Sequence, residues 1–316
     1  MAQDSEKARL DDAARAGWLY FVAGNTQDEI ARKLNVSRPT AQRLVSLAIS
    51  ERLITFRLEH PIARCMEMAA RLAERFGLVH CEVAPSDPAT ETVTIGIAEL
   101  TAAFIEGRLK SDKPVILAIG TGRSLRAAVD QIQPMKCPHH ELVSMVGNIT
   151  PDGSASFFDV LSKLADLTQA RHYPIPLPLM TSSAEEKSLL LGLGPVRRVH
   201  QLAEKADVTL VGIGHVGVDA PLFLDGFISR EEVIESMRLG AVGEICSWCF
   251  DAEGRILEKG FNARITSVRH QVPPPGLKVG VAAGRVKVPA IRAAMAGRII
   301  NGLITNEETA ELLLGS

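Results

Sequence analysis

The side chains that most plainly suggest a chemistry lie between residues 37 and 51, on the polar face of a predicted helix. Arginine, glutamine and hydroxyl side chains can pair with the edges of guanine or adenine and with phosphates in a major groove. The face presents Arg38, Thr40, Gln42, Arg43 and Ser46. Their types and spacing indicate a helix that could read DNA.

Three predicted helices position this face. The first has apolar residues at helical spacing, namely Ala14, Trp18, Phe21 and Val22. Thr26 and Glu29 form a capping box, which predicts a second helix over Gln27–Leu34. Ser37 caps the third helix, and Pro39 stands in its first turn, where a missing N–H is harmless. A short helix, a tight turn and a polar third helix predict a helix-turn-helix.

The charge of the chain is unevenly distributed. Its 316 residues carry 35 basic and 37 acidic side chains, a net charge of −2, which excludes a uniformly basic nucleic-acid coat. Residues 1–58 carry +2 and the remainder −4, while residues 30–57 alone carry +5. A three-helix bundle with a merely solvated polar face is the alternative, and it does not explain this excess. The alternating segment 53–58 could form a small wing.

Beyond residue 58 apolar runs alternate with helical patterns, which predicts parallel βαβ units covered on both faces. The predicted strands span 115–119, 141–146, 208–213 and 277–282. The predicted helices span 65–76, 124–131, 157–168, 186–191 and 195–205. We therefore predict an α/β protein with a winged-helix-like helix-turn-helix domain at 1–58 and a Rossmann-like α/β domain at 59–316.

Two glycine-rich loops follow predicted strands, where ligands bind in an open α/β sheet. Residues 120–124 (GTGRS) open a helix, so their backbone N–H groups and the helix dipole can receive an anion. Residues 212–217 have the pattern GxGxxG. A dinucleotide site would need an acidic residue about twenty positions on that follows a strand, and none does. We interpret these glycines as a tight turn.

Cysteine and histidine give little indication of a metal or redox site. Cys246 and Cys249 form a single CxxC pair without the further ligands of a zinc site or the helix start of a redox site, so we interpret them as strand cysteines. His139 and His140 are expected to be solvent-exposed. Five cysteines, no apolar run of about 18 residues and no signal peptide favour a cytoplasmic location without membrane contact. No cofactor is expected.

Two long stretches resemble one known family. The stretch TQDEIARKLNVSRPTAQRLVSLAISERLI resembles the DNA-binding segment of the SorC family of bacterial transcriptional regulators, and VGVAAGRVKVPAIRAAMAGRIINGLITNEETAELLL resembles the end of that family's sugar-binding domain. The resemblance implies a sugar-phosphate isomerase/deaminase-like domain used as a sensor, and a tetramer. It also implies a reader helix at about 37–51, whose DNA contacts are Ser37, Arg38, Thr40, Gln42 and Arg43.

The resemblance further implies a ligand pocket. Its expected residues are Gly120, Thr121, Gly122, Arg123, Ser124, Asn148, Gly214, Asp225, Glu244 and Lys287. Carboxylate and amide groups can bridge neighbouring hydroxyls, while lysine and arginine pair with phosphate or carboxylate. Alternatively, Glu244 and Lys287 are ordinary surface charges and Asp225 is a turn residue.

The sequence departs from the family pattern at two positions. Arg285 stands where a glycine is common, and it could reshape the pocket or contact a phosphate. Asn306 replaces the usual aspartate and removes a charge near the end of the domain. Both departures bear on which ligand is bound.

These observations favour a ligand-responsive regulator of a carbohydrate or polyol catabolic operon. A small sugar, polyol or sugar phosphate would alter its affinity for operator DNA, and a homo-oligomer is expected because a lone helix-turn-helix reads only a half-site. The main alternative is an isomerase or deaminase of sugar phosphates with an appended helix-turn-helix, since a fold does not fix a function. The sequence shows no clustered acid/base pair for such chemistry, so we expect no enzyme. Constitutive DNA binding with a structural C-terminal domain is a third possibility.

Overall fold

The computed structural model describes residues 2–51, 53–54, 62–86, 94–149 and 159–315. The chain divides into two compact units, residues 1–60 and 61–316. In the part of the chain that is described, no helix is long and apolar enough to cross a membrane.

The first unit consists of three helices, α1 (Ala2–Phe21), α2 (Gln27–Leu34) and α3 (Arg38–Ser50). The predicted capping box is confirmed: the Glu29 N–H donates to Thr26 Oγ1, and the Thr26 N–H donates to Glu29 Oε2. Asn35 ends α2 in the left-handed conformation, which allows the tight turn before α3. Ser37 then caps α3 by accepting the Thr40 N–H.

The core of this unit differs from the prediction along α1. Ala13 and Ala16 are buried, whereas the predicted Trp18, Phe21 and Val22 are exposed. The reason is a close approach between helices: a Cβ on Gly17 would lie 2.8 Å from the Ala48 Cβ, so small residues must face α3. The predicted wing is not seen at residues 53–54, which form a bend, and its remainder lies outside the described residues.

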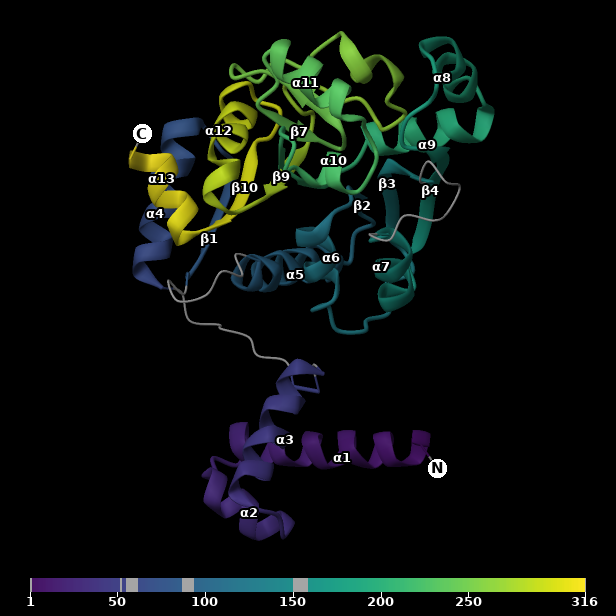
Figure 1. The fold of residues 1–316 in the computed structure, drawn as a ribbon. Helices are drawn as coiled ribbons and strands as arrows, with labels where there is room; N and C mark the ends of the chain where they lie inside the picture. Colours follow the sequence, from purple (N-terminus) through teal and green to yellow (C-terminus); the bar gives the residue numbers. More distant parts are fainter. Residues whose placement is uncertain (1, 52, 55–61, 87–93, 150–158, 316) are drawn as a thin grey trace. The chain divides into compact units, whose positions relative to one another are not determined.

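The second unit is built on a parallel sheet of seven strands in the described chain, in the order β1-β10-β9-β5-β2-β3-β4 (Figure 1). The strands are β1 (His80–Ala84), β2 (Ile116–Ile119), β3 (Glu141–Ile149), β4 (Arg171–Pro178), β5 (Val208–Gly212), β9 (Leu277–Val281) and β10 (Gly302–Asn306). The helices around it are α4 (Ala63–Phe76), α5 (Ile95–Leu109), α6 (Arg123–Val129), α7 (Leu161–Thr168), α8 (Ala184–Leu191), α9 (Gly194–Glu204), α12 (Val288–Ala296) and α13 (Glu307–Gly315). The predicted parallel α/β fold is confirmed.

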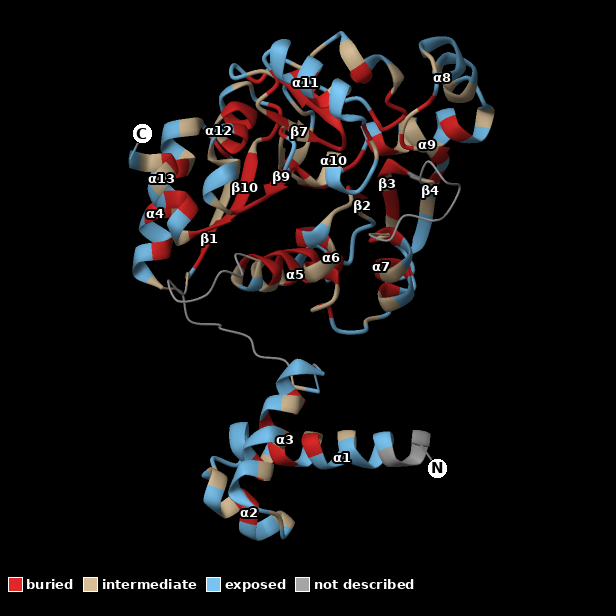
Figure 2. Cartoon of the chain, viewed as in Figure 1, coloured by how far each residue is buried: buried red, intermediate tan, exposed pale blue. Residues whose placement is uncertain are grey.

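Successive strand residues pack on opposite faces of the sheet and form two separate cores. Leu117 and Leu210 pack with α5, α6 and α7 on one face. Ala118 and Val211 pack with α4, α9, α12 and α13 on the other. Figure 2 shows the central strands buried, as expected when helices cover both faces of a parallel sheet.

A small lobe is attached to the sheet and has its own apolar cluster around Val233, Trp248 and Phe261. Its antiparallel sheet consists of β6 (Gly214–His215), β7 (Gly243–Ile245) and β8 (Trp248–Phe250). The helices of this region are α10 (Pro221–Leu224), α11 (Arg230–Arg238) and the 3₁₀ turn Gly260–Arg264, and a second 3₁₀ turn, Arg285–Lys287, precedes α12.

Candidate functional site

A cavity of about 160 Å³ opens where the strand order of the sheet reverses. From β2 the chain continues to β3 and β4 on one side, whereas β5, which pairs with β2 on the other side, continues to β9 and β10. The loops that follow β2 and β5 therefore diverge and leave a crevice at the carboxyl ends of these strands. Ligands of open α/β sheets bind at such reversals.

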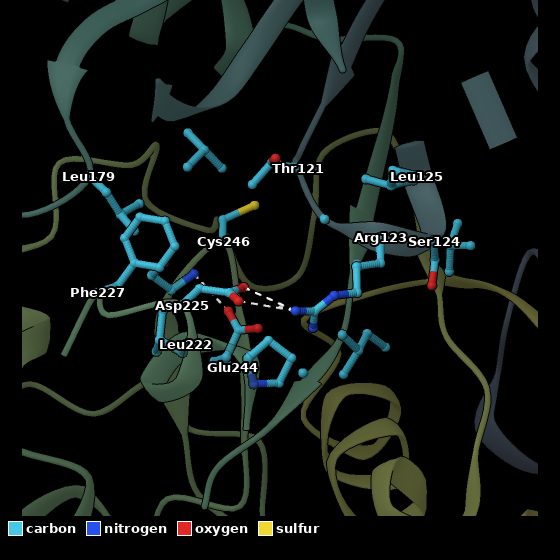
Figure 3. A pocket seen from close by; sticks show the side chains of 18 of the residues that line it. Thr121, Arg123, Ser124, Leu125, Leu179, Leu222, Asp225, Phe227, Glu244 and Cys246 are labelled. Carbon is cyan, nitrogen blue, oxygen red and sulfur yellow. Dashed lines mark hydrogen bonds and ion pairs between the residues drawn. The ribbon is translucent and has the colours of Figure 1, made fainter. Parts of the chain in front are cut away.

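An ion pair joins the sheet to the small lobe across this cavity. Arg123, at the start of α6, donates from one Nη atom to both carboxylate oxygens of Asp225, at 3.0 and 3.4 Å (Figure 3). Asp225 follows α10 directly and ends that short helix. The interpretation of Asp225 as a simple turn residue is therefore incomplete, because its side chain points into the cavity (Figure 3).

Glu244 lies in β7, where it pairs with Gly214 of β6. Its carboxylate packs directly over that glycine: a Cβ on Gly214 would stand 2.1 Å from Glu244 Oε1. The other oxygen, Oε2, accepts the Ser247 N–H at 2.7 Å. Burial raises the pKa of Glu244, although this hydrogen bond and the positive charge of Lys287 oppose the rise. Glu244 is thus not an ordinary surface charge.

Lys287 ends the 3₁₀ turn before α12 and lines the same cavity. Its side chain is half-buried, and burial lowers its pKa, while the carboxylate of Glu244 opposes this and the guanidinium of Arg123 adds to it. The four charged groups of the cavity therefore influence one another electrostatically.

The structure brings most of the predicted pocket residues together. Those that line the cavity are Thr121, Gly122, Arg123, Ser124, Gly214, Asp225, Glu244 and Lys287. Gly120 is not among the residues that line the cavity. Its N–H donates to the Leu210 carbonyl at 2.8 Å and so continues the pairing of β2 with β5. Asn148 lies in β3, but its side chain is outside the described residues.

The cavity also has an apolar wall that the sequence reading did not predict. Its members include Val146, Leu179, Leu222, Phe227 and Val281. These residues come from strand ends, from α10 and from the loop that follows α10, where an apolar residue is equally typical of the core. The glycine at position 147, directly after a predicted strand, is the sequence feature that marks this wall. A Cβ there would lie 2.5 Å from the Leu177 carbonyl, so β3 and β4 approach closely beside the cavity.

The two departures from the family pattern lie outside the cavity. Arg285 is exposed, its guanidinium lies 3.8 Å from the Glu308 carboxylate, and it is not among the residues that line the cavity. Asn306 is buried and its Oδ1 accepts the Thr309 N–H at 3.1 Å. An aspartate could accept the same bond, so the substitution keeps the cap of α13 and removes only the charge.

Three further interpretations need correction. His140 is buried rather than exposed: the Val115 N–H donates to its Nδ1, and its Nε2 donates to the Leu109 carbonyl. Cys246 lies in the β7–β8 turn with a positive φ of 51° and lines the cavity, so of the CxxC pair Cys249 alone lies in a strand. Burial raises the pKa of both thiols, which makes them poor nucleophiles. The GxGxxG glycines Gly212 and Gly214 face the cavity rather than forming only a turn.

In the first unit, the predicted reading face of α3 is largely exposed. Arg38, Gln42 and Arg43 are solvent-exposed, and Thr40 is half-buried. Arg38 lies 3.5 Å from the Asp28 carboxylate, and Arg43 donates weakly to the Pro39 carbonyl and Thr40 Oγ1, both at 3.4 Å. Exposed contacts of this kind contribute little to stability, so these side chains can be redirected to another partner.

Comparison with known proteins identifies the class of protein to which the chain belongs. Residues 60–315 match the family described as "Putative sugar-binding domain". The erythritol catabolism regulatory protein EryD of Brucella abortus (strain 2308) is 33% identical over 310 residues, which cover 98% of each chain. LsrR, a transcriptional regulator of Escherichia coli (strain K12), is 30% identical over 317 residues, covering 97% of this chain and 95% of LsrR.

A solved structure agrees in fold. The full-length sorbitol operon regulator SorC of Klebsiella pneumoniae has a TM-score of 0.72 at 24% identity, covering 96% of this chain and 97% of that one. The chain is a transcriptional regulator with a sugar-binding domain, as its matched domain and its similarity to these relatives show. The chain belongs to the SorC family.

Proposed function

We propose that the chain controls a carbohydrate or polyol catabolic operon by binding operator DNA with its first unit and a small polyhydroxy effector in the cavity. The observation that carries the proposal is the cavity at the strand-order reversal, where Arg123, Asp225, Glu244 and Lys287 converge. Such groups can donate to and accept from the hydroxyls of one ligand.

The first unit is proposed to be a helix-turn-helix whose reader is α3. Its support is the pair of capped helices joined at Asn35 and the net charge of +5 in residues 30–57. Arg38, Gln42 and Arg43 would contact bases or phosphates in the major groove, with Ser37 and Thr40 at the first turn of the helix. Full-length similarity to named regulators supports the same assignment.

The size of the cavity favours a small effector. A cavity of ~150 Å³ accommodates benzene, so about 160 Å³ suits a polyol or sugar of similar bulk. Relatives named for erythritol catabolism and for the sorbitol operon support a polyol. The domain would act as a sensor on an isomerase/deaminase-like scaffold and not as an enzyme, because Asp225 and Glu244 are already held by Arg123 and by the Ser247 N–H.

A homo-oligomer, and in particular a tetramer, is part of the proposal. Two copies of α3 are needed to read a palindrome, and the effector must bind one quaternary arrangement more tightly than the other, since equal affinity would shift nothing.

The test measures coupling between the two sites in the full chain. Binding to a fluorescent DNA fragment from upstream of the gene is followed by anisotropy, with and without a panel of polyols, sugars and their monophosphates. At least one compound should change the DNA dissociation constant by about 5- to 150-fold, the usual range of allosteric coupling. A panel that changes neither DNA affinity nor thermal stability would refute the proposal. Turnover of any sugar phosphate would favour the enzyme instead.

A further inference from the structure

The charges that line the cavity are balanced. Among its described lining residues, the cations are Arg123 and Lys287 and the anions are Asp225 and Glu244. The remaining lining residues are apolar, small or uncharged. A cavity built mainly to hold a phosphate dianion would be expected to carry an excess of positive charge.

Each cation shares the cavity with a carboxylate, and for Arg123 the two are in direct contact. Arg123 holds both oxygens of Asp225, at 3.0 and 3.4 Å. The charge of Glu244 acts on Lys287 and favours its protonated form. A dianion that approached either cation would therefore meet a carboxylate beside it, and juxtaposed like charges at a binding site cost several kcal/mol.

The backbone offers less to an anion than the GTGRS motif suggests. The N–H of Gly120 donates to the Leu210 carbonyl of β5 and is not available to a ligand. The N–H of Ser247, in the β7–β8 turn beside the cavity, donates to Glu244 at 2.7 Å. Two backbone donors at this cavity are thus used by the protein itself.

We infer that the cavity selects a neutral polyhydroxy compound over the phosphorylated form of the same compound. A hydroxyl can donate to the carboxylate of Asp225 or Glu244 and also accept from Arg123 or Lys287, so a neutral polyol satisfies both signs of charge. A phosphate only accepts at these positions and leaves the carboxylates facing a negative group. The inference rests on the proposed function, because it concerns the effector of that same site.

Matched pairs of ligands test the inference. Calorimetric titration of the full chain compares erythritol with erythritol 4-phosphate and D-glucitol with D-glucitol 6-phosphate. In the pair that binds, the neutral member should bind at least about tenfold more tightly. Tighter binding of the phosphate overturns the inference and leaves the proposed function standing. Failure of all four to bind counts against both.

Two isosteric variants assign the selectivity to the carboxylates. Glu244→Gln removes a negative charge while it keeps the shape of the side chain, so the preference for the neutral member should shrink by about tenfold or more. Asp225→Asn, at an exposed residue of the cavity lining, provides a second variant if the first unfolds. Glu308→Gln is the control, because Glu308 is exposed and pairs with Arg285 outside the cavity. An unchanged ratio in both variants, each shown to be folded by circular dichroism, overturns the inference.

Discussion

Replacing Gly214 by alanine tests how Glu244 is held. In the structure, the new Cβ would stand 2.1 Å from Glu244 Oε1 and 3.0 Å from its Cδ, closer than real atoms approach. The backbone at Gly214 is an ordinary strand, so the substitution introduces no conformational strain of its own. The carboxylate must therefore swing away from β6.

The cost follows from the contact that the carboxylate loses. Glu244 Oε2 accepts the Ser247 N–H at 2.7 Å, and a hydrogen bond to a charged group contributes about 1.5–3 kcal/mol. Gly214→Ala should lower the free energy of unfolding by an amount in that range. Because the carboxylate also leaves its place in the cavity, effector affinity should fall by about 10- to 150-fold, which is the same range expressed as a ratio.

Urea denaturation and calorimetric titration measure the two effects. Gly107→Ala is the matched control: Gly107 is an exposed residue within α5 with open space around it, so this change should raise stability by about 0.4–1 kcal/mol. The double variant Gly214→Ala/Glu244→Ala should be no less stable than Glu244→Ala alone, because neither can form the Ser247 hydrogen bond and the clash is gone. If Gly214→Ala denatures and binds as the natural chain does, Glu244 is not held against β6 and the description of the site is wrong.

Three further predictions concern the other parts of the molecule. Arg43→Ala should weaken operator binding by about 1–3 kcal/mol if Arg43 contacts a base. If Arg43 contacts a phosphate, the variant should instead reduce by about one the slope of the logarithm of the DNA binding constant against the logarithm of the salt concentration. DNA titrations at several salt concentrations distinguish the two, and effector affinity should not change. Lys287→Ala should reduce the response to effector while DNA binding without effector stays unchanged, as anisotropy can show. Burial of His270 lowers the pKa of its imidazole to about 3, and the positive charge of Lys278 adds to this effect. Below about pH 6.5 the unfolded chain therefore binds a proton at His270 that the folded chain does not bind. This difference should lower the free energy of unfolding by about 2 kcal/mol at pH 5 relative to pH 7.5. Urea titrations at the two pH values should show a smaller loss in His270→Asn.

The sequence predicted four of the seven strands of the sheet, because parallel strands buried on both faces leave a clear pattern, but it did not predict β1, β4 or β10. The runs at 115–119, 208–213 and 277–282 correspond to β2, β5 and β9 within a residue or two. The antiparallel lobe was predicted only as strand residues around Cys246 and Cys249, without its strand pairing, because β6, β7 and β8 are two or three residues long, too short to show any periodicity.

Predictions that depended on the surroundings of a residue were less successful. His140 looked exposed because it follows a proline and another histidine, yet two backbone groups 25 and 31 residues away in sequence satisfy its ring and allow burial. Trp18 looked like core because it is apolar and falls at helical spacing with Ala14, Phe21 and Val22, yet the close approach of α1 to α3 admits only small residues. Contacts between distant segments decided both cases, and no local pattern records them.

The position of the cavity at the strand-order reversal has an evolutionary consequence. The charged lining residues Arg123, Asp225, Glu244 and Lys287 belong to neither apolar core, whereas Val146, Leu179 and Val281 of the apolar wall also pack in the two sheet cores. Substitutions at the charged positions can therefore alter what the cavity binds without disturbing these cores, whereas substitutions in the apolar wall would also disturb the packing of the scaffold. Relatives that share about a third of their residues or fewer carry names from erythritol, deoxyribonucleoside and sorbitol metabolism, as expected for a scaffold that diversifies at one crevice.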